Sequence, residues 1–211
     1  MSFVPPTAQR LTIDGPAGPL EALLEAPASA SPATRYAVVC HPHPLFSGTM
    51  HNKVVHTLAR ALQELGVPTL RFNFRGVGAS AGTYDNAVGE TEDAIAVADW
   101  GARQFPGAEL WSAGFSFGSF VAYRLALARS ATRLITVAPP VQRFNFEHLA
   151  TPTCPWLVIQ GDQDELVNHE LVLAWARELT PAPKVALLAG AEHFFHGRLA
   201  DLRAEVQSFL R

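Results

Sequence analysis

Cysteine is scarce in this chain, in which Cys40 and Cys154 are the two cysteines among 211 residues. One disulfide is possible by count, but a fold that is held together by disulfides needs several such pairs. Free cysteine is among the residue types that are most often buried, so we expect two buried free thiols. The sequence therefore excludes a disulfide-stabilised scaffold.

Long hydrophobic runs and an excess of basic residues are also missing. No apolar stretch approaches the roughly 18 residues that a membrane-spanning helix requires. The first residues, MSFVPPTAQR, contain no basic segment followed by an apolar run. The 16 Lys and Arg residues are outnumbered by 19 Asp and Glu residues, which gives a net charge of -3. We therefore expect a soluble, cytoplasmic protein whose partners include neither a membrane nor a nucleic acid.

What the sequence does contain is a large apolar fraction. Hydrophobic residues make up 48% and charged residues 17% of the chain, which is an ordinary balance for a globular protein. The length is sufficient for one domain with a large core, and neither a linker nor an internal repeat divides it. We predict a single domain over residues 1–211.

Apolar, strand-like segments alternate with helical patterns along most of the chain. Predicted strands cover residues 10–14, 20–25, 36–40, 68–74, 133–138, 156–160 and 184–188, predicted helices cover 50–65, 87–103, 167–179 and 199–210, and residues 110–129 form a strand, a tight turn and a helix. This alternation predicts an α/β fold: a mostly parallel central sheet with helices on both faces, preceded by an N-terminal antiparallel hairpin. We expect the loops that follow the strands to converge at one edge of the sheet, where ligands bind.

The segment from Gly114 to Gly118 fits the pattern G-x-S-x-G, with Ser116 at its centre. In a tight strand-to-helix turn the serine hydroxyl points out of the sheet, and glycine at both flanking positions avoids a clash of Cβ. The N–H of Phe117 would then face an oxyanion at the start of the helix. Three fixed positions also match by chance, so a Gly-rich turn without chemistry is the alternative.

A serine hydroxyl needs a base within hydrogen-bond reach, and the base needs a carboxylate that fixes its tautomer. We prefer His193 among the eight histidines, because its loop follows the last predicted strand and can reach Ser116. Asp162 and Asp164 both follow the preceding strand. We predict Asp164 as the acid and expect Asp162 to bind backbone N–H groups of the loop. The order Ser116, Asp164, His193 is the one expected with such a turn.

A second N–H group for the oxyanion is expected in the loop that follows the third predicted strand. Pro42 and Pro44 have no N–H. The remaining candidates are His43, Leu45 and Phe46, and among them we predict Leu45.

Two other patterns could indicate a bound group. His41 and His43 form an H-x-H pattern, but no further cluster of His and Asp at usable spacing follows. We therefore expect no metal and a structural role for His41. The Gly-rich loop 75–82 lacks the Lys-Ser/Thr pair of a phosphate-binding loop and does not open directly into a helix. We expect no cofactor.

Taken together, these motifs resemble the α/β-hydrolase superfamily over nearly the whole chain. The segments Gly114–Gly118, Gly161–Asp164 and Ala191–His193 match its nucleophile, acid and base positions. The segment His41–Met50 resembles a small bacterial subgroup of hydrolases that is similar to dienelactone hydrolases. This sequence has His41-Pro42 where most of the superfamily has His-Gly.

Many members of this superfamily carry a lid domain between the sixth strand and the strand before the acid. Only residues 139–155 separate those strands here, which is enough for one short helix at about 144–149 and for no lid. We therefore expect an open, shallow site that is lined by Phe46, Phe115 and Phe144.

The sequence thus predicts a serine hydrolase that cleaves an ester or thioester of a small-molecule acyl substrate through an acyl-enzyme. Two alternatives stay open, namely a non-catalytic binding scaffold on the same fold and a metal-dependent hydrolase that uses His41 and His43. Peptidases and lactonases share the same triad, so the fold does not select the acyl group. No coiled-coil heptads predict an oligomeric state.

Overall fold

The computed structural model describes residues 7–27 and 32–211. Within them, eight strands form one sheet in the order β1-β2-β4-β3-β5-β6-β7-β8. The strands are β1 (Thr7–Gly15), β2 (Gly18–Ala26), β3 (Arg35–Cys40), β4 (Thr69–Phe72), β5 (Glu109–Phe115), β6 (Arg133–Val137), β7 (Trp156–Gly161) and β8 (Lys184–Leu188). Strands β3 to β8 run parallel, whereas β2 pairs antiparallel with both β1 and β4. The predicted parallel sheet and N-terminal hairpin are confirmed.

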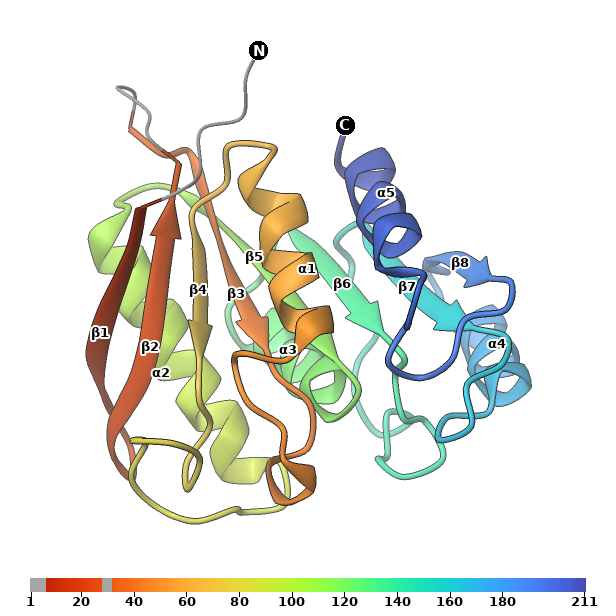
Figure 1. Ribbon diagram of the computed structural model, residues 1–211, viewed down its shortest axis with the longest axis horizontal. Helices are drawn as coiled ribbons and strands as arrows, with labels where there is room; N and C mark the ends of the chain where they lie inside the picture. The colour runs from red at the N-terminus through yellow and green to blue at the C-terminus, as the bar shows by residue number, and fades with distance from the viewer. Residues whose placement is uncertain (1–6, 28–31) are drawn as a thin grey trace.

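Helices cover both faces of this sheet. They are α1 (Lys53–Gln63), α2 (Val88–Gln104), α3 (Phe117–Ala128), α4 (His169–Glu178) and α5 (Leu199–Leu210). Helices α1 and α5 pack against each other in front of the sheet in Figure 1, and α2 and α3 lie behind it. Helix α4 joins α2 and α3, because its Val172 belongs to the same buried cluster as Ala94 and Val121. The three-layer arrangement is the predicted one.

Strand β3 illustrates why the sheet is covered on both faces. Residues 36–40 are all buried. Successive side chains of a strand point to opposite faces. Val38 accordingly packs into the core with α2 and α3, and Val39 packs into the core with α1 and α5. An apolar run of this kind is stable only in the interior of a sheet with two covered faces.

The segment between β6 and β7, residues 138–155, consists of turns and contains no helix where the sequence predicted one at about residues 144–149. Phe146 anchors this segment, since its side chain is 2% exposed. Its ring lies 4.8 Å from that of Phe120, 5.3 Å from that of Tyr123 and 4.9 Å from that of Trp175, measured between centroids. A short segment that is packed onto the body in this way forms no lid, and the fold is lidless as predicted.

The expectations from composition have a mixed outcome. Both cysteines are free thiols, but only Cys40 is fully buried, whereas Cys154 is partly exposed. In the described residues, the helices are too short or too polar to span a membrane.

The parallel strands bring the singled-out residues to one edge of the sheet. Ser116 follows β5, Asp164 follows β7 and His193 follows β8. This is the edge to which the arrowheads of β3, β4 and β6 point at the bottom of Figure 1.

Candidate active site

Ser116 lies in a strained turn between β5 and α3. Its backbone has φ 53° and ψ −123°, a conformation that costs a non-glycine residue on the order of 1–3 kcal/mol. The Ser116 N–H donates to the carbonyl of Val137 in β6 over 2.8 Å, and this bond ties the turn to the sheet. The sequence-predicted turn is thus present.

The two glycines allow the chain to turn this sharply. A Cβ on Gly114 would lie 2.0 Å from the carbonyl oxygen of Gly118. A Cβ on Gly118 would lie 2.4 Å from the carbonyl oxygens of Cys40 and His41. Both distances are far inside van der Waals contact, so only glycine fits. The second contact also shows that the loop after β3 lies against the start of α3.

Ser116, His193 and Asp164 form one hydrogen-bonded chain. Ser116 Oγ lies 3.1 Å from His193 Nε2, and His193 Nδ1 lies 2.8 Å from Asp164 Oδ2 and 3.0 Å from Oδ1. His193 and Asp164 are buried, whereas Ser116 is partly exposed. When Nδ1–H donates to the carboxylate, Nε2 keeps its lone pair for the serine proton.

Asp164 is held as a carboxylate by donors on both oxygens. Its Oδ1 accepts the N–H groups of Leu166 and Val167 at 2.9 and 2.7 Å, and its Oδ2 accepts Gln160 Nε2 at 3.0 Å. Burial raises the pKa of Asp164, but the hydrogen bond and charge of His193, together with the backbone donors, outweigh burial and hold this pKa below its usual value. Asp164 is therefore ionised at neutral pH.

Asp162 has the separate role that the sequence predicted. Its Oδ1 accepts the N–H of Gly190 over 2.7 Å, which links the loops after β7 and β8. His196, three residues after His193, is exposed, and its Nδ1 lies 3.3 Å from Glu192 Oε2.

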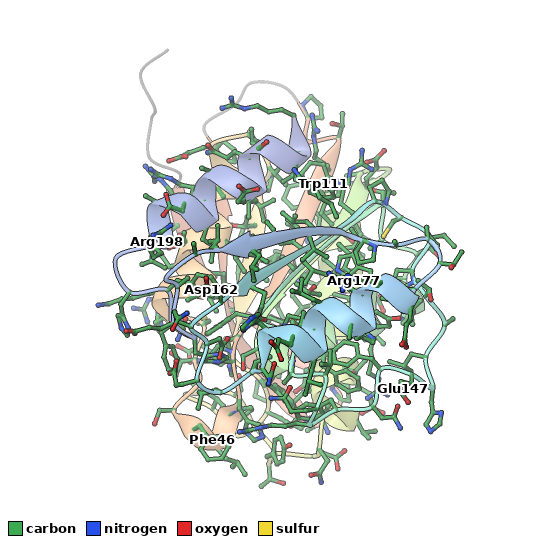
Figure 2. All side chains as sticks on the ribbon, turned by 90° about the vertical axis from the view of Figure 1, so that its right-hand side faces the viewer. Phe46, Trp111, Glu147, Asp162, Arg177 and Arg198 are labelled. Carbon is green, nitrogen blue, oxygen red and sulfur yellow. The ribbon has the colours of Figure 1, made fainter. Side chains whose placement is uncertain are left out.

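Ser116 and His193 open into a cavity of about 650 Å³, within the usual range for small-molecule sites. The predicted residues Phe46 and Phe144 both line it, together with Phe194. Phe46 is 75% exposed and lies at the lower edge of the molecule in Figure 2. The cavity therefore places Ser116 and His193 beside a largely apolar wall.

Known proteins share this architecture. The pattern of the alpha/beta hydrolase domain family matches residues 47–208. The chain belongs to the alpha/beta hydrolase family. A serine hydrolase without a lid from Xanthomonas campestris is 44% identical, with a TM-score of 0.93 over 100% of this chain and 97% of that chain. A serine hydrolase homologue from Coxiella burnetii is 45% identical, with a TM-score of 0.92 over 100% of both chains.

More distant proteins extend the comparison. An uncharacterized protein of Rickettsia prowazekii is 34% identical over 95% of this chain and 88% of its own length. A dienelactone hydrolase from Anabaena variabilis has the same fold, with a TM-score of 0.82 at 15% identity over 98% of each chain. The resemblance inferred from the motifs is confirmed, and the family match together with the serine hydrolase homologues from Xanthomonas campestris and Coxiella burnetii supports hydrolase activity for this chain.

Phe115 does not line the cavity of this hydrolase, and that prediction was wrong. The residue is fully buried in the core between the sheet and helices α1 and α5. Its ring lies 5.0 Å from the His193 ring, measured between centroids. Phe115 therefore packs against the histidine and does not form a wall for a substrate.

The prediction of Leu45 as an oxyanion donor also fails on geometry. Leu45 is 67% exposed, and its N–H donates to His43 Nδ1 over 3.2 Å. The N–H of Phe46 donates to the His43 carbonyl over 3.1 Å. The N–H of His43 has no acceptor among the residues that the structure describes. His43 also lines the same cavity as Ser116 and Phe117, and Leu45 does not.

His41 is a structural residue, as the sequence indicated. It is 0% exposed. Its Nε2 accepts the N–H of Phe74 over 3.0 Å, and its Nδ1 donates to the carbonyl of Pro42 over 2.6 Å. Burial lowers the pKa of His41 to about 3, so the ring is neutral. Both ring nitrogens are engaged, which leaves His41 without a lone pair for a metal ion.

The sequence analysis missed two residues of the site. Gln160 donates to Asp164, and a polar residue at the end of an apolar strand was the available signal. Arg143 lines the cavity from the irregular segment between β6 and β7, for which no motif exists.

Proposed function

We propose that this alpha/beta hydrolase is a serine esterase or thioesterase that acts on small-molecule acyl substrates through an acyl-enzyme on Ser116. The observation that carries this proposal is the unbroken hydrogen-bonded chain from Ser116 Oγ through His193 to Asp164. At its Ser116 end, this hydrogen-bonded chain opens into a cavity of about 650 Å³, which is large enough for an ester of moderate size.

In the first half of the reaction, His193 Nε2 takes the Ser116 proton while Oγ attacks the carbonyl carbon. The tetrahedral intermediate collapses as His193 gives that proton to the departing alcohol or thiol, and the acyl group stays on Ser116. In the second half, His193 takes a proton from water, the hydroxide attacks the acyl carbon, and the proton returns to Ser116 Oγ as the acid leaves. The Asp164 carboxylate stabilises the imidazolium in both halves.

Two backbone N–H groups are proposed to hold the oxyanion. Phe117 is the first residue of α3, where an N–H has no partner within the helix and the helix dipole favours negative charge. The second donor is His43, whose N–H lacks an acceptor in the described part of the chain. One donor of this kind contributes on the order of 10²–10³ in kcat.

The test compares wild type with Ser116→Ala on p-nitrophenyl esters of increasing acyl length. We expect hydrolysis by wild type only, with the same thermal unfolding in both proteins, since the variant loses a single hydroxyl. Full activity of Ser116→Ala would contradict the proposal.

A fluorophosphonate probe separates the enzyme from a non-catalytic scaffold. We expect mass spectrometry to find the label on Ser116 of the wild type. If wild type shows neither hydrolysis nor labelling, the scaffold is the better interpretation.

A further inference from the structure

Arg143 is the one residue with a permanent charge among the described residues that line the cavity around Ser116. The lining includes no Asp, Glu or Lys, and its other ionisable groups are His43 and His193. A largely apolar cavity with one cation and no anion attracts negative charge, because low-dielectric walls focus the field of that cation.

The backbone around Arg143 is well fixed. The N–H groups of Arg143 and Phe144 both donate to the carbonyl of Pro140, over 2.9 and 3.1 Å. The Phe144 ring lies 5.0 Å from that of Phe120 and 5.4 Å from that of Phe117, measured between centroids. The Arg143 side chain therefore extends from a packed wall of the cavity and not from a loose loop.

The Arg143 guanidinium has no carboxylate of its own. In the described residues it makes neither an ion pair nor a hydrogen bond, and it is exposed. Two arginines of the chain segment around β4 are paired with carboxylates: Arg71, within β4, lies 2.8 Å from Glu25, and Arg75, just after β4, lies 2.8 Å from Asp93. Arg143 thus keeps its donors for a ligand.

The charge of Arg143 acts close to the reacting serine. Burial, and after it the positive charge of Arg143, lowers the pKa of His43. The His43 ring lies 4.9 Å from the ring of Phe117, the residue that follows Ser116. A substrate at Ser116 would lie in the same field.

We propose that Arg143 is a specificity-determining residue that selects esters bearing a carboxylate. A guanidinium binds a carboxylate through two parallel hydrogen bonds, and Phe46 and Phe144 offer apolar surface to the carbon chain between the carboxylate and the ester. This inference rests on the proposed function. The carboxylate can stand on the acyl chain or on the leaving group, and the two positions need separate substrates.

Two ester pairs test the proposal. Mono-p-nitrophenyl adipate and p-nitrophenyl hexanoate share a six-carbon acyl chain and differ in the terminal carboxylate. 4-Acetoxybenzoate carries the carboxylate on the leaving group, and its methyl ester is the neutral member of that pair. In Arg143→Met we expect KM to rise about tenfold for the anionic member of one pair, with kcat and both neutral esters little changed. The pair that responds locates the carboxylate.

Two further variants serve as controls. Arg143→Lys keeps the charge without the planar fork, so it restores part of the loss. Arg177→Met removes one exposed positive charge from α4, where Figure 2 labels it. Arg177 does not line the cavity. We expect Arg177→Met to leave all four substrates unchanged. An equal effect of Arg143→Met on anionic and neutral esters would overturn the proposal.

The experiment separates this inference from the proposed function. If wild type hydrolyses no ester faster than Ser116→Ala, the proposed function fails. Arg143 is then tested by calorimetric binding of adipate to wild type and to Arg143→Met. Binding that is about tenfold weaker in the variant supports an anion site. Equal binding, or no binding to wild type, overturns it.

Discussion

Gln160 Nε2 donates a hydrogen bond to Asp164 Oδ2 over 3.0 Å, and the same oxygen accepts His193 Nδ1. Gln160 is fully buried, and its Oε1 has no partner among the described residues. An unpartnered buried oxygen costs about 1–3 kcal/mol. The amide keeps this orientation because the reverse one would turn Oε1 toward the Asp164 carboxylate and the carbonyl of Gly161. Gln160 is therefore a positioning residue for Asp164.

Replacing Gln160 by Met removes this donor and keeps a side chain of similar length. The Asp164 carboxylate then accepts one hydrogen bond fewer and attracts the Nδ1 proton of His193 more strongly. We expect kcat/KM on a p-nitrophenyl ester to fall about tenfold, and its acidic limb to move to higher pH by about half a unit to one unit. The measurement is a pH profile of kcat/KM beside urea unfolding. A lower stability with an unshifted pH profile would indicate a purely structural role.

Asp164 and Asp162 provide a matched pair, since they lie two residues apart in one loop. Asp164→Asn cannot stabilise the imidazolium and presents the wrong tautomer to Ser116, so we expect kcat to fall on the order of 10³–10⁴-fold. Asp162→Asn keeps an oxygen that can accept the N–H of Gly190, and we expect its kcat within about threefold of wild type. Steady-state kinetics of both variants decide the assignment. Comparable losses would mean that the acid was assigned to the wrong residue.

The sheet and the triad could be predicted from sequence because both depend on local patterns. Continuous apolar runs such as 36–40 require cover on both faces, and parallel strands bring their following loops to one edge. Element ends were less precise. The helix predicted over 50–65 begins at Lys53, since Asn52 caps it by accepting the N–H of Val54 over 2.9 Å. Asparagine is a preferred capping residue, so this signal was present in the sequence.

The two site residues that were placed wrongly failed for different reasons. Phe115 still belongs to β5, where alternate residues share a face, and Ala113 packs into the same core. A period of two would have placed Phe115 in that core. Leu45 lies in a short 3-10 turn, Pro44–Phe46. The Leu45 N–H donates to the ring of His43. That outcome depends on one side-chain orientation, which no sequence pattern encodes.

Gly118→Ala tests the packing of the turn separately from its chemistry. In an unconstrained helix alanine is about 1 kcal/mol more favourable than glycine. Here the new Cβ would lie 2.4 Å from two backbone carbonyl oxygens, of Cys40 and His41, that cannot rotate away. We expect the free energy of unfolding to fall by about 3 kcal/mol or more, together with a loss of activity. Urea unfolding measures the first quantity. Ser116→Ala is the control, because we expect it to be inactive and as stable as wild type. A Gly118→Ala protein that is as stable as this control would contradict the packing argument.

We expect protonation of His41 to contribute to the loss of stability of the fold in acid. Burial lowers its pKa to about 3 in the folded state, whereas an unfolded histidine titrates near about 6.5. The unfolded chain thus binds a proton that the folded chain does not. The stability from neutral His41 is present above about pH 6.5 and is lost as the pH falls toward the folded value.

Between pH 7 and pH 5 this linkage amounts to about 2 kcal/mol of unfolding free energy. Asparagine at position 41 does not titrate, yet it keeps a donor and an acceptor for the carbonyl of Pro42 and the N–H of Phe74. We expect His41→Asn to be less stable at pH 7, because its shorter side chain reaches these partners less well. Its stability would then fall about 2 kcal/mol less than that of the wild type between the two pH values. Urea unfolding at pH 7, 6 and 5 gives both slopes, and parallel slopes would mean that another group carries the acid sensitivity.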